Sequence, residues 1–394
     1  MPEQNIFVLD DERDIGEYVC TVAKMNGFES HYFSNPNEFF AALAASPTAC
    51  VAIDLQMPIL DGIEVMRRLS AMQFHRPILI MSGMDLKVLE SARHFAKAHR
   101  LAVSDIISKP VRVEEMNRIF GRLKSSSHLP PSKADLIEAM ERGEFVLYLQ
   151  PKARIRNEPG GHSRYTPLGF EGLARWNSPT RGLSVPDVFI PQIIASGLSP
   201  QFSDLVFDLA LATLKRWGPS AITASLAINM SASDVEDITL ADRLWSRCLG
   251  SGVDHQRITI EITESAAMEH PERALDVLTR LRLRGFSLSL DDFGTGYSSL
   301  VQLQRLPFAE LKIDRSLTAD CMSSEHTRII VKAIIDLGHN LGLAVVAEGV
   351  EDQETLELLS NWSCDHVQGY LLAQPLPPDL AEKWWHEKHG SAHP

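Results

Sequence analysis

The chain has 394 residues, of which 44% are hydrophobic, so it is long enough for two globular domains and too apolar for a disordered protein. Lys and Arg number 38 and Asp and Glu number 51, which gives a net charge of −13. This charge excludes a general electrostatic attraction to duplex nucleic acid or to an anionic membrane. If the substrate is anionic, bound metal ions must supply the positive charge.

The 5 cysteines lie far apart in the sequence, and no apolar run approaches membrane-spanning length. The N-terminal residues show no signal-peptide pattern. We therefore expect a reduced, cytoplasmic protein that is not inserted into a membrane.

Residues 1–123 alternate short apolar runs with segments of helical periodicity. Apolar strands alternating with helices predict an α/β fold, here a doubly wound parallel sheet of five strands with helices on both faces. Four of these strands can be placed, at residues 6–9, 50–53, 77–81 and 105–108. Right-handed crossovers put the ends of parallel strands on one edge, so the residues that follow them should meet in one cleft. These residues are Asp10, Asp11, Asp54, Ser82 and Lys109.

The chemistry of this set is coherent. Three carboxylates can hold one hard divalent cation such as Mg²⁺ and leave a ligand position for a phosphoryl oxygen. Asp54 is then a candidate nucleophile that becomes an aspartyl phosphate. Lys109 would pair with the new charge, and Ser82 would hydrogen-bond to it. The alternative is a set of strand-end acids that are merely exposed to solvent.

This region resembles a two-component receiver domain. The resemblance is carried by Asp10-Asp11, the DLQMPILDG stretch at residues 54–62, Ser82 and Lys109-Pro110. It implies a flavodoxin-like fold, one bound Mg²⁺, and phosphorylation of Asp54 by a histidine kinase or a phosphotransfer protein. One position departs from the family pattern, because Ile106 stands where receivers usually carry an aromatic switch residue three positions before the Lys.

Residues 124–132 break all periodicity and combine Ser with two Pro, which predicts a short linker. A helix over residues 133–142, stopped by Gly143, should open the second domain, residues 133–394.

The second domain alternates apolar strand candidates with helical segments, which predicts a TIM-like (β/α)8 barrel. Eight strands can be placed, at residues 145–149, 168–173, 226–230, 258–262, 286–290, 311–313, 344–347 and 366–370. The segment 154–167 reads as an unusually long connection between the first two strands.

Polar side chains gather at the ends of these strands, where such barrels carry their active sites. They are Glu171 and Arg175, Asn229, Glu261 and Glu264, Asp291 and Asp292, Lys312 and Asp314, Glu348 and Glu351, and Gln368. The set is rich in oxygen ligands and lacks Cys, so it suits Mg²⁺ or Mn²⁺ rather than structural zinc. So many carboxylates would repel one another unless cations neutralised them. The pair Asp291-Asp292, taken alone, is also compatible with a solvated acidic turn.

The same domain resembles the EAL-domain cyclic di-GMP phosphodiesterases over essentially its whole length. Two departures are mild, since Gly172 replaces the usual Ala and Gln374 stands where a basic residue is common. The motifs that carry the resemblance are Glu171-Gly172-Leu173-Ala174-Arg175, Asn229, Glu261-Ile262-Thr263-Glu264, Asp291-Asp292-Phe293-Gly294-Thr295-Gly296-Tyr297, Lys312-Ile313-Asp314, Glu348-Gly349-Val350-Glu351 and Gln368-Gly369-Tyr370-Leu371.

This resemblance implies hydrolysis of cyclic di-GMP to linear pGpG with two Mg²⁺ or Mn²⁺ ions. The implied metal ligands are Glu171, Asn229, Glu261, Asp291 and Asp292. Lys312 and Glu348 would serve the attacking water, and which of them takes the proton stays open. Glu264 would anchor the loop at residues 293–300. The implied substrate-binding residues are Gln150, Leu173, Arg175, Asp314, Glu351 and Gln368.

Two other functions remain open, a catalytically silent cyclic di-GMP sensor and a protein-interaction scaffold. Degenerate members would be expected to lose metal ligands or the Lys, and none is missing here. The family also suggests a homo-oligomer formed through the barrel. The partner kinase, the preferred metal and the sign of regulation by phosphorylation are not encoded in these motifs.

Overall fold

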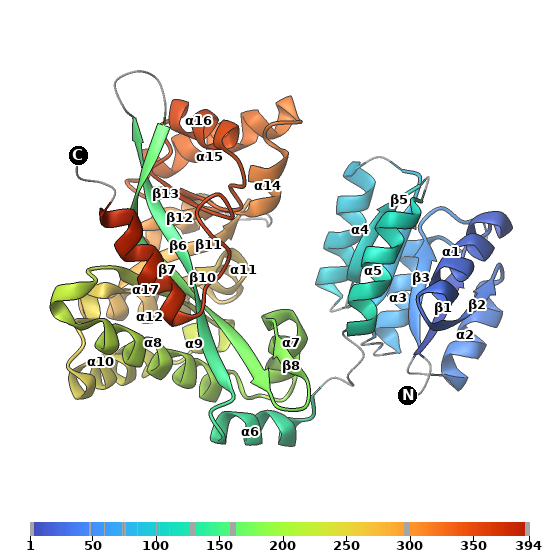
Figure 1. The fold of residues 1–394 in the computed structure, drawn as a ribbon, viewed down its shortest axis with the longest axis horizontal. Helices are drawn as coiled ribbons and strands as arrows, with labels where there is room; N and C mark the ends of the chain where they lie inside the picture. Colours follow the sequence, from blue (N-terminus) through green and yellow to red (C-terminus); the bar gives the residue numbers. More distant parts are fainter. Residues whose placement is uncertain are drawn as a thin grey trace. The chain divides into compact units, whose positions relative to one another are not determined.

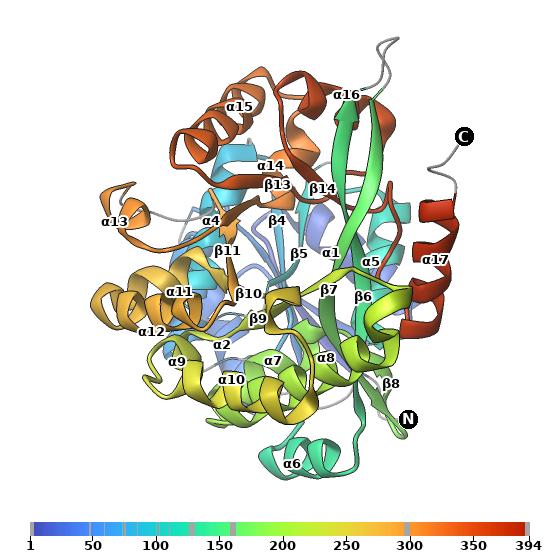
Figure 2. The ribbon, with the colours of Figure 1, turned by 90° about the vertical axis from the view of Figure 1, so that its left-hand side faces the viewer.

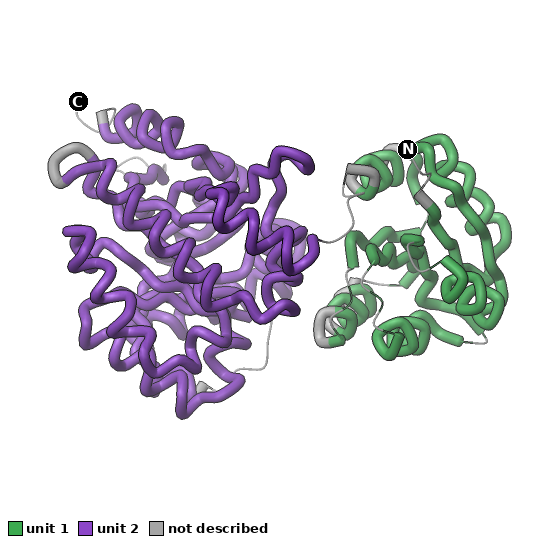
Figure 3. The backbone as a smooth tube through the Cα atoms, turned by 90° about the horizontal axis from the view of Figure 1, so that it is seen from below, with its two compact units in different colours: residues 1–129 green, residues 130–394 purple. Residues whose placement is uncertain are grey.

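The computed structural model describes residues 4–46, 49–58, 60–72, 74, 76–84, 86–99, 101, 103–109, 111–125, 131–157, 163–294 and 300–390. The chain divides into two compact units, Met1–Leu129 and Pro130–Pro394 (Figure 3). Parts of four predicted features lie outside the described residues, namely Ile59 and Pro110 of the receiver motifs, residues 126–130 of the linker, 158–162 of the long connection, and 295–299 after the Asp pair. Within the described part of the chain, no helix is both long and apolar enough to cross a membrane.

The first unit is a five-stranded parallel sheet in the order β2-β1-β3-β4-β5, which confirms the predicted fold class. Its strands are β1 (Gln4–Leu9), β2 (Phe28–Phe33), β3 (Cys50–Asp54), β4 (Ile78–Ser82) and β5 (Val103–Ser108). Its helices are α1 (Arg13–Met25), α2 (Pro36–Ala45), α3 (Gly62–Ala71), α4 (Leu86–Ala98) and α5 (Val113–Ser125). The sequence placed four of these strands but not β2, whose FESHYF run mixes polar and aromatic residues.

Alternate residues of β1 explain the two helix layers. Phe7 and Leu9 belong to one buried cluster, which α2, α3 and α4 complete, whereas Ile6 and Val8 belong to the other, which α1 and α5 complete. Because side chains of a strand alternate between faces, a continuous apolar run fills both cores at once.

The second unit is a closed barrel flanked by helices. Its strands are β6 (Phe145–Asn157), β7 (Ser163–Ser178), β8 (Gly182–Ser184), β9 (Ser225–Met230), β10 (Ile258–Thr263), β11 (Ser287–Phe293), β12 (Glu310–Ile313), β13 (Ala344–Ala347) and β14 (His366–Gln368). Its α-helices are α6 (Lys133–Glu141), α7 (Pro186–Ala195), α8 (Ser199–Ala221), α9 (Ala232–Val235), α10 (Leu240–Ser251), α11 (Glu264–Glu269), α12 (Pro271–Leu283), α13 (Leu300–Arg305), α14 (Arg315–Asp320), α15 (Glu325–Asn340), α16 (Gln353–Asn361) and α17 (Pro378–Gly390), and a short 3-10 turn covers His255–Arg257.

The first barrel strand departs from the all-parallel expectation. β6 pairs antiparallel with β7 and with β14, and the pairing of β6 with β7 closes the barrel. The two strands run side by side far beyond the rest of the barrel (Figures 1 and 2). The expectation that residues 154–167 form an unusually long connection between the first two strands was therefore wrong for the described part, because residues 154–157 and 163–167 belong to the paired strands themselves. A direct hairpin without a crossover helix can join only antiparallel strands.

The other barrel strands, β7 and β9 to β14, run parallel to one another, so their carboxyl ends share one mouth. The C-terminal helix α17 packs beside the β6–β7 hairpin (Figure 1). Its Trp384 and Trp385 lie 5.8 Å and 5.7 Å from the ring of Phe170 on β7. These aromatic contacts tie the end of the described chain to the strand that carries the Glu171 motif.

Candidate functional sites

Strand ends of the barrel bring one lysine and four acids together. The Nζ atom of Lys312 on β12 lies 2.7 Å from Glu348, 2.9 Å from Glu261, 3.2 Å from Asp291 and 3.3 Å from Glu171. Lys312 is 1% exposed, and Glu261 is fully buried. We call these four acids the carboxylate ring. It gathers residues from β7, β10, β11 and the segment after β13, as their strand-end positions predicted.

The charges of the ring do not balance, because four carboxylates face a single ammonium group. Burial, and after it the charge of Glu171, raises the pKa of Glu261 well above its ordinary value. Burial likewise raises the pKa of Glu348 to about 8. Burial alone would lower the pKa of Lys312, but the surrounding acids raise it, so the lysine stays protonated. The ring is therefore short of positive charge.

The donor atoms of the ring fit a hard divalent cation. Glu171, Glu261 and Asp291 each offer an oxygen, and these oxygens lie within 4.8 Å of one another. The buried Oε1 atom of Glu261 has no hydrogen-bond partner among the described residues. Asn229 lies at the same place, since its side-chain amide donates to Glu171 over 2.8 Å. Carboxylate and amide oxygens are ligands that Mg²⁺ and Mn²⁺ prefer.

The end of β11 shows how two successive acids can serve one site. Asp292 has a φ of +56°, in the left-handed region, and its backbone N–H donates to the Asp291 carboxylate over 2.9 Å. Because the backbone leaves the extended conformation at Asp292, the alternation that would point the side chains of Asp291 and Asp292 to opposite faces of the sheet no longer applies. Two residues later, Gly294 has a φ of +98°, and its N–H donates to Glu264 over 3.1 Å. Glu264 is thus hydrogen-bonded to the second residue of the loop, at residues 293–300, that it was expected to anchor.

A cavity of about 290 Å³ opens beside the ring. Five of the six predicted substrate-binding residues line it: Gln150, Leu173, Arg175, Glu351 and Gln368. The sixth, Asp314, is not among the described lining residues, and its carboxylate instead caps α14 by accepting from the N–H of Ser316. The lining also includes Arg315 and Tyr370, which the sequence analysis did not select. Both lie two positions after the last residue of a strand, where strand alternation no longer predicts the direction of a side chain.

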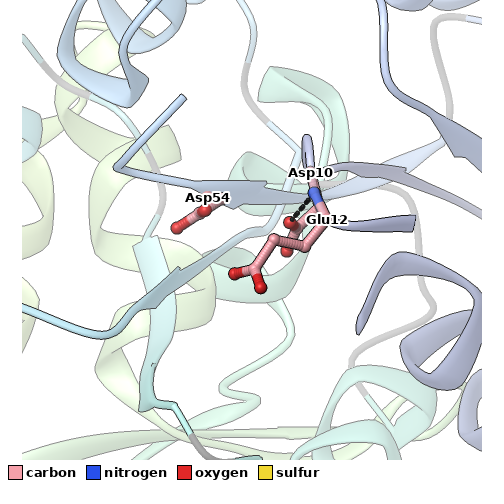
Figure 4. A group of neighbouring side chains, drawn as sticks. All are labelled: Asp10, Glu12 and Asp54. Carbon is pink, nitrogen blue, oxygen red and sulfur yellow. Dashed lines mark hydrogen bonds between the residues drawn. The ribbon is translucent and has the colours of Figure 1, made fainter. Parts of the chain in front are cut away.

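The first unit gathers a second acidic cluster at the carboxyl edge of its sheet. Lys109 Nζ lies 2.9 Å from Asp54, 3.0 Å from Asp10 and 3.3 Å from Glu12. Figure 4 shows the three carboxylates, which come from the end of β3, the end of β1 and the turn after β1. Oxygens of Asp10, Glu12 and Asp54 lie within 4.8 Å of one another, which fits a single hard cation.

Glu12 was missed by the sequence analysis, which selected Asp11. Asp11 and Glu12 are both exposed, and both line a cavity of about 450 Å³ that also includes Asp54 and Lys109. Three consecutive acids follow β1, and the chain turns there, so the sequence alone could not decide which two bring an oxygen close to Asp54. Burial raises the pKa of Asp10, which is fully buried.

Two further receiver positions are placed by the sheet. Ser82, fully buried at the end of β4, accepts from the N–H of Met84 through its hydroxyl, and its carbonyl accepts from the N–H of Lys109 over 2.8 Å. Ile106 is half-buried and packs against the cluster that contains Leu9 and Ile53. At the position where receivers usually carry an aromatic switch residue, this chain therefore has an aliphatic side chain that packs against the core.

Two family models match the chain. The EAL domain matches residues 133–375, and the response regulator receiver domain matches residues 6–120. RocR of Pseudomonas aeruginosa, named a cyclic di-GMP phosphodiesterase, is 28% identical over 389 residues, which are 96% of this chain and 97% of RocR. MucR of the same organism, named a bifunctional diguanylate cyclase/cyclic di-GMP phosphodiesterase, is 37% identical over 246 residues, 62% of this chain and 35% of MucR. This chain therefore spans about a third of the length of MucR.

A solved structure gives the same result for the barrel. The MucR phosphodiesterase in complex with cyclic di-GMP is 37% identical, with a TM-score of 0.58 over 63% of this chain and 98% of that one. The chain therefore belongs to the EAL-domain family and carries a response regulator receiver domain before its EAL domain.

Proposed function

We propose that the EAL domain of this chain hydrolyses cyclic di-GMP to linear pGpG and that its receiver domain controls this activity. The observation that carries the proposal is the buried carboxylate ring around Lys312, which is short of positive charge and lies beside a cavity. The names of RocR and MucR, and the cyclic di-GMP complex of MucR, support the choice of substrate.

Two Mg²⁺ or Mn²⁺ ions would be held by Glu171, Asn229, Glu261, Asp291 and Asp292. When bound, such ions polarise the phosphoryl group and acidify the attacking water. The shortage of positive charge in the ring and the unpartnered oxygen of Glu261 support this donor set. The surplus of acid over base gives the site an affinity for cations before the substrate arrives.

The chain's own residues supply the rest of the chemistry. Lys312 stays protonated among the acids, so it can stabilise negative charge that develops on the phosphoryl oxygens. Glu348, whose carboxylate lies 2.7 Å from Lys312, is the better acceptor for the proton of the attacking water, because Lys312 already holds its own proton. Gln150, Leu173, Arg175, Glu351 and Gln368 would hold the substrate in the cavity.

Regulation would begin at Asp54. With Mg²⁺ held by Asp10, Glu12 and Asp54, a histidine kinase or phosphotransfer protein would phosphorylate Asp54, and Lys109 would pair with the phosphoryl group. Asp11, which lines the same cavity, could contribute a further ligand. We also propose that the protein forms a homo-oligomer through its EAL barrel.

The test is the incubation of purified protein with cyclic di-GMP and Mg²⁺ or Mn²⁺, with and without a chelator. The chromatographic appearance of pGpG, abolished by the chelator and by Lys312→Met, is the expected result. Lys332→Met is the matched control, because Lys332 forms an exposed ion pair with Asp336 on α15 and does not touch the ring. Binding without turnover would instead favour a cyclic di-GMP sensor, and neither binding nor turnover would favour a scaffold.

A further inference from the structure

A second polar layer lies inside the barrel, directly next to the ring and its cavity. Each of its four members stands two positions along a strand from a residue of the candidate site. Because side chains two positions apart on a strand point to the same side, each member points into the lumen together with its site neighbour. We call this set the inner layer. Its members and their site neighbours are Lys152 and Gln150 on β6, Ser289 and Asp291 on β11, Glu310 and Lys312 on β12, and His366 and Gln368 on β14.

The inner layer is held together by Glu310. Its carboxylate accepts from Lys152 Nζ over 2.8 Å and 3.0 Å and from the Ser289 hydroxyl over 2.9 Å. The Nδ1 atom of His366 lies 3.5 Å from the same carboxylate. Lys152 is 3% exposed and Glu310 is 8% exposed. The sheet order places β14 and β13 between β6 and β12, so the contact of Lys152 with Glu310 crosses the lumen of the barrel.

Stability alone does not account for this arrangement. The interior of such barrels is normally filled by layers of apolar side chains. Replacing a buried ion pair by apolar residues of similar volume is often neutral or stabilising. An apolar layer would therefore close the barrel at least as well, and the polar one calls for another role.

The contacts of the inner layer lead back to the carboxylate ring. Lys152 stands opposite Gln368 in the pairing of β6 with β14, and Gln368 donates to Glu171 over 2.6 Å. Ser289 stands opposite Glu261 in the pairing of β10 with β11. The strand positions of two ring acids are thus fixed by neighbours that the inner layer holds.

We propose that Lys152 and Glu310 are positioning residues for the metal-binding ring. By joining β6 to β12 through the lumen, their ion pair sets the separation of the strands that carry Gln150, Lys312 and, through Gln368, Glu171. This inference rests on the proposed function, since it assigns the inner layer to the same site. It concerns the ability of the ring to receive cations rather than contact with the substrate.

The test compares three proteins by Mn²⁺ binding without substrate, measured by calorimetry, by chemical unfolding, and by kcat and KM. They are the wild type, the double variant Lys152→Met with Glu310→Met, and a control in which the exposed pair Lys332 and Asp336 is changed to Met in the same way. The double variant should keep the unfolding midpoint of the wild type. It should bind Mn²⁺ about 10-fold to 100-fold more weakly, as with other groups that orient metal ligands, and lose kcat with little change in KM.

A folded double variant with the Mn²⁺ affinity and kcat of the wild type would overturn the inference and leave the inner layer a structural filling. If the double variant does not fold, Glu310→Gln replaces it, because the amide can still accept from Ser289 but no longer pairs with Lys152 as an ion. Unchanged Mn²⁺ affinity in folded Glu310→Gln would equally overturn it. A wild type that binds Mn²⁺ without turnover would refute the proposed hydrolysis only, since the binding comparison still decides the positioning role.

Discussion

Removal of the ammonium group at the centre of the carboxylate ring should make the EAL domain dependent on metal for its stability. In Lys312→Met, four acids that now lie 2.7 to 3.3 Å from Lys312 Nζ keep no cation among them. Breaking a buried ion pair by removing one partner costs about 3–5 kcal/mol of unfolding free energy. Because all four acids share this one lysine, we expect the variant in chelator to lose unfolding free energy near the upper end of this range. Partial protonation of Glu348 reduces the loss.

Tryptophan fluorescence can follow this loss in the intact protein. All 6 tryptophans lie between Trp176 and Trp385, so denaturant unfolding monitored this way reports on the EAL domain and not on the receiver. Mg²⁺ at millimolar concentration should restore much of the lost stability, since the cation replaces the missing charge. The exposed-pair variant Lys332→Met should stay within about 0.5 kcal/mol of the wild type in both buffers. The reasoning would be refuted if Lys312→Met were as stable as the wild type in chelator. It would also be refuted if Mg²⁺ restored none of the stability that the variant loses.

Three further outcomes follow from the same contacts. Glu264→Ala should lose turnover while its unfolding midpoint moves little, because its carboxylate holds the N–H of Gly294 at the start of the loop after the Asp pair; normal turnover would show that the loop needs no such anchor. Acetyl phosphate with Mg²⁺ should add one phosphoryl group to the receiver, and Asp54→Asn should remove that adduct in intact-mass spectra; an adduct of equal size on the variant would place the phosphorylation elsewhere. In chelator, the stability of the EAL domain should fall as pH rises from about 5 to 8, by up to about 1.4 kcal/mol per pH unit. The sign follows because the pKa of Glu348, raised by burial from 4.5 to about 8, leaves a proton on the folded chain that the unfolded chain has already released. Urea unfolding midpoints of the chelated protein that stay constant across this pH range would contradict the predicted fall in stability.

The sequence could predict most of the fold because strand patterns and strand-end chemistry are local signals. Continuous apolar runs predicted four of the five receiver strands, and β2 escaped because its polar and aromatic residues carry no such run. Motif residues such as Glu171, Glu261, Asp291 and Lys312 could be selected because parallel strands bring their carboxyl ends to one mouth. The antiparallel course of β6 could not be predicted, since residues 154–157 and 163–167 have the composition of a loop and form strands through pairing between β6 and β7 and between β6 and β14.

By itself, the sequence determined which chemical groups stand at the strand ends and hence that the two units would each collect acids beside a lysine. Only the tertiary structure decided how these groups meet: that Glu12 joins Asp10 and Asp54, that Asp314 caps a helix, and that Lys152 reaches Glu310 through the lumen. The physical reason is that alternation fixes the face of a residue within its own strand. Contacts across a closed barrel depend on the order and register of strands that are distant in sequence, and these are set by the packing of the whole domain.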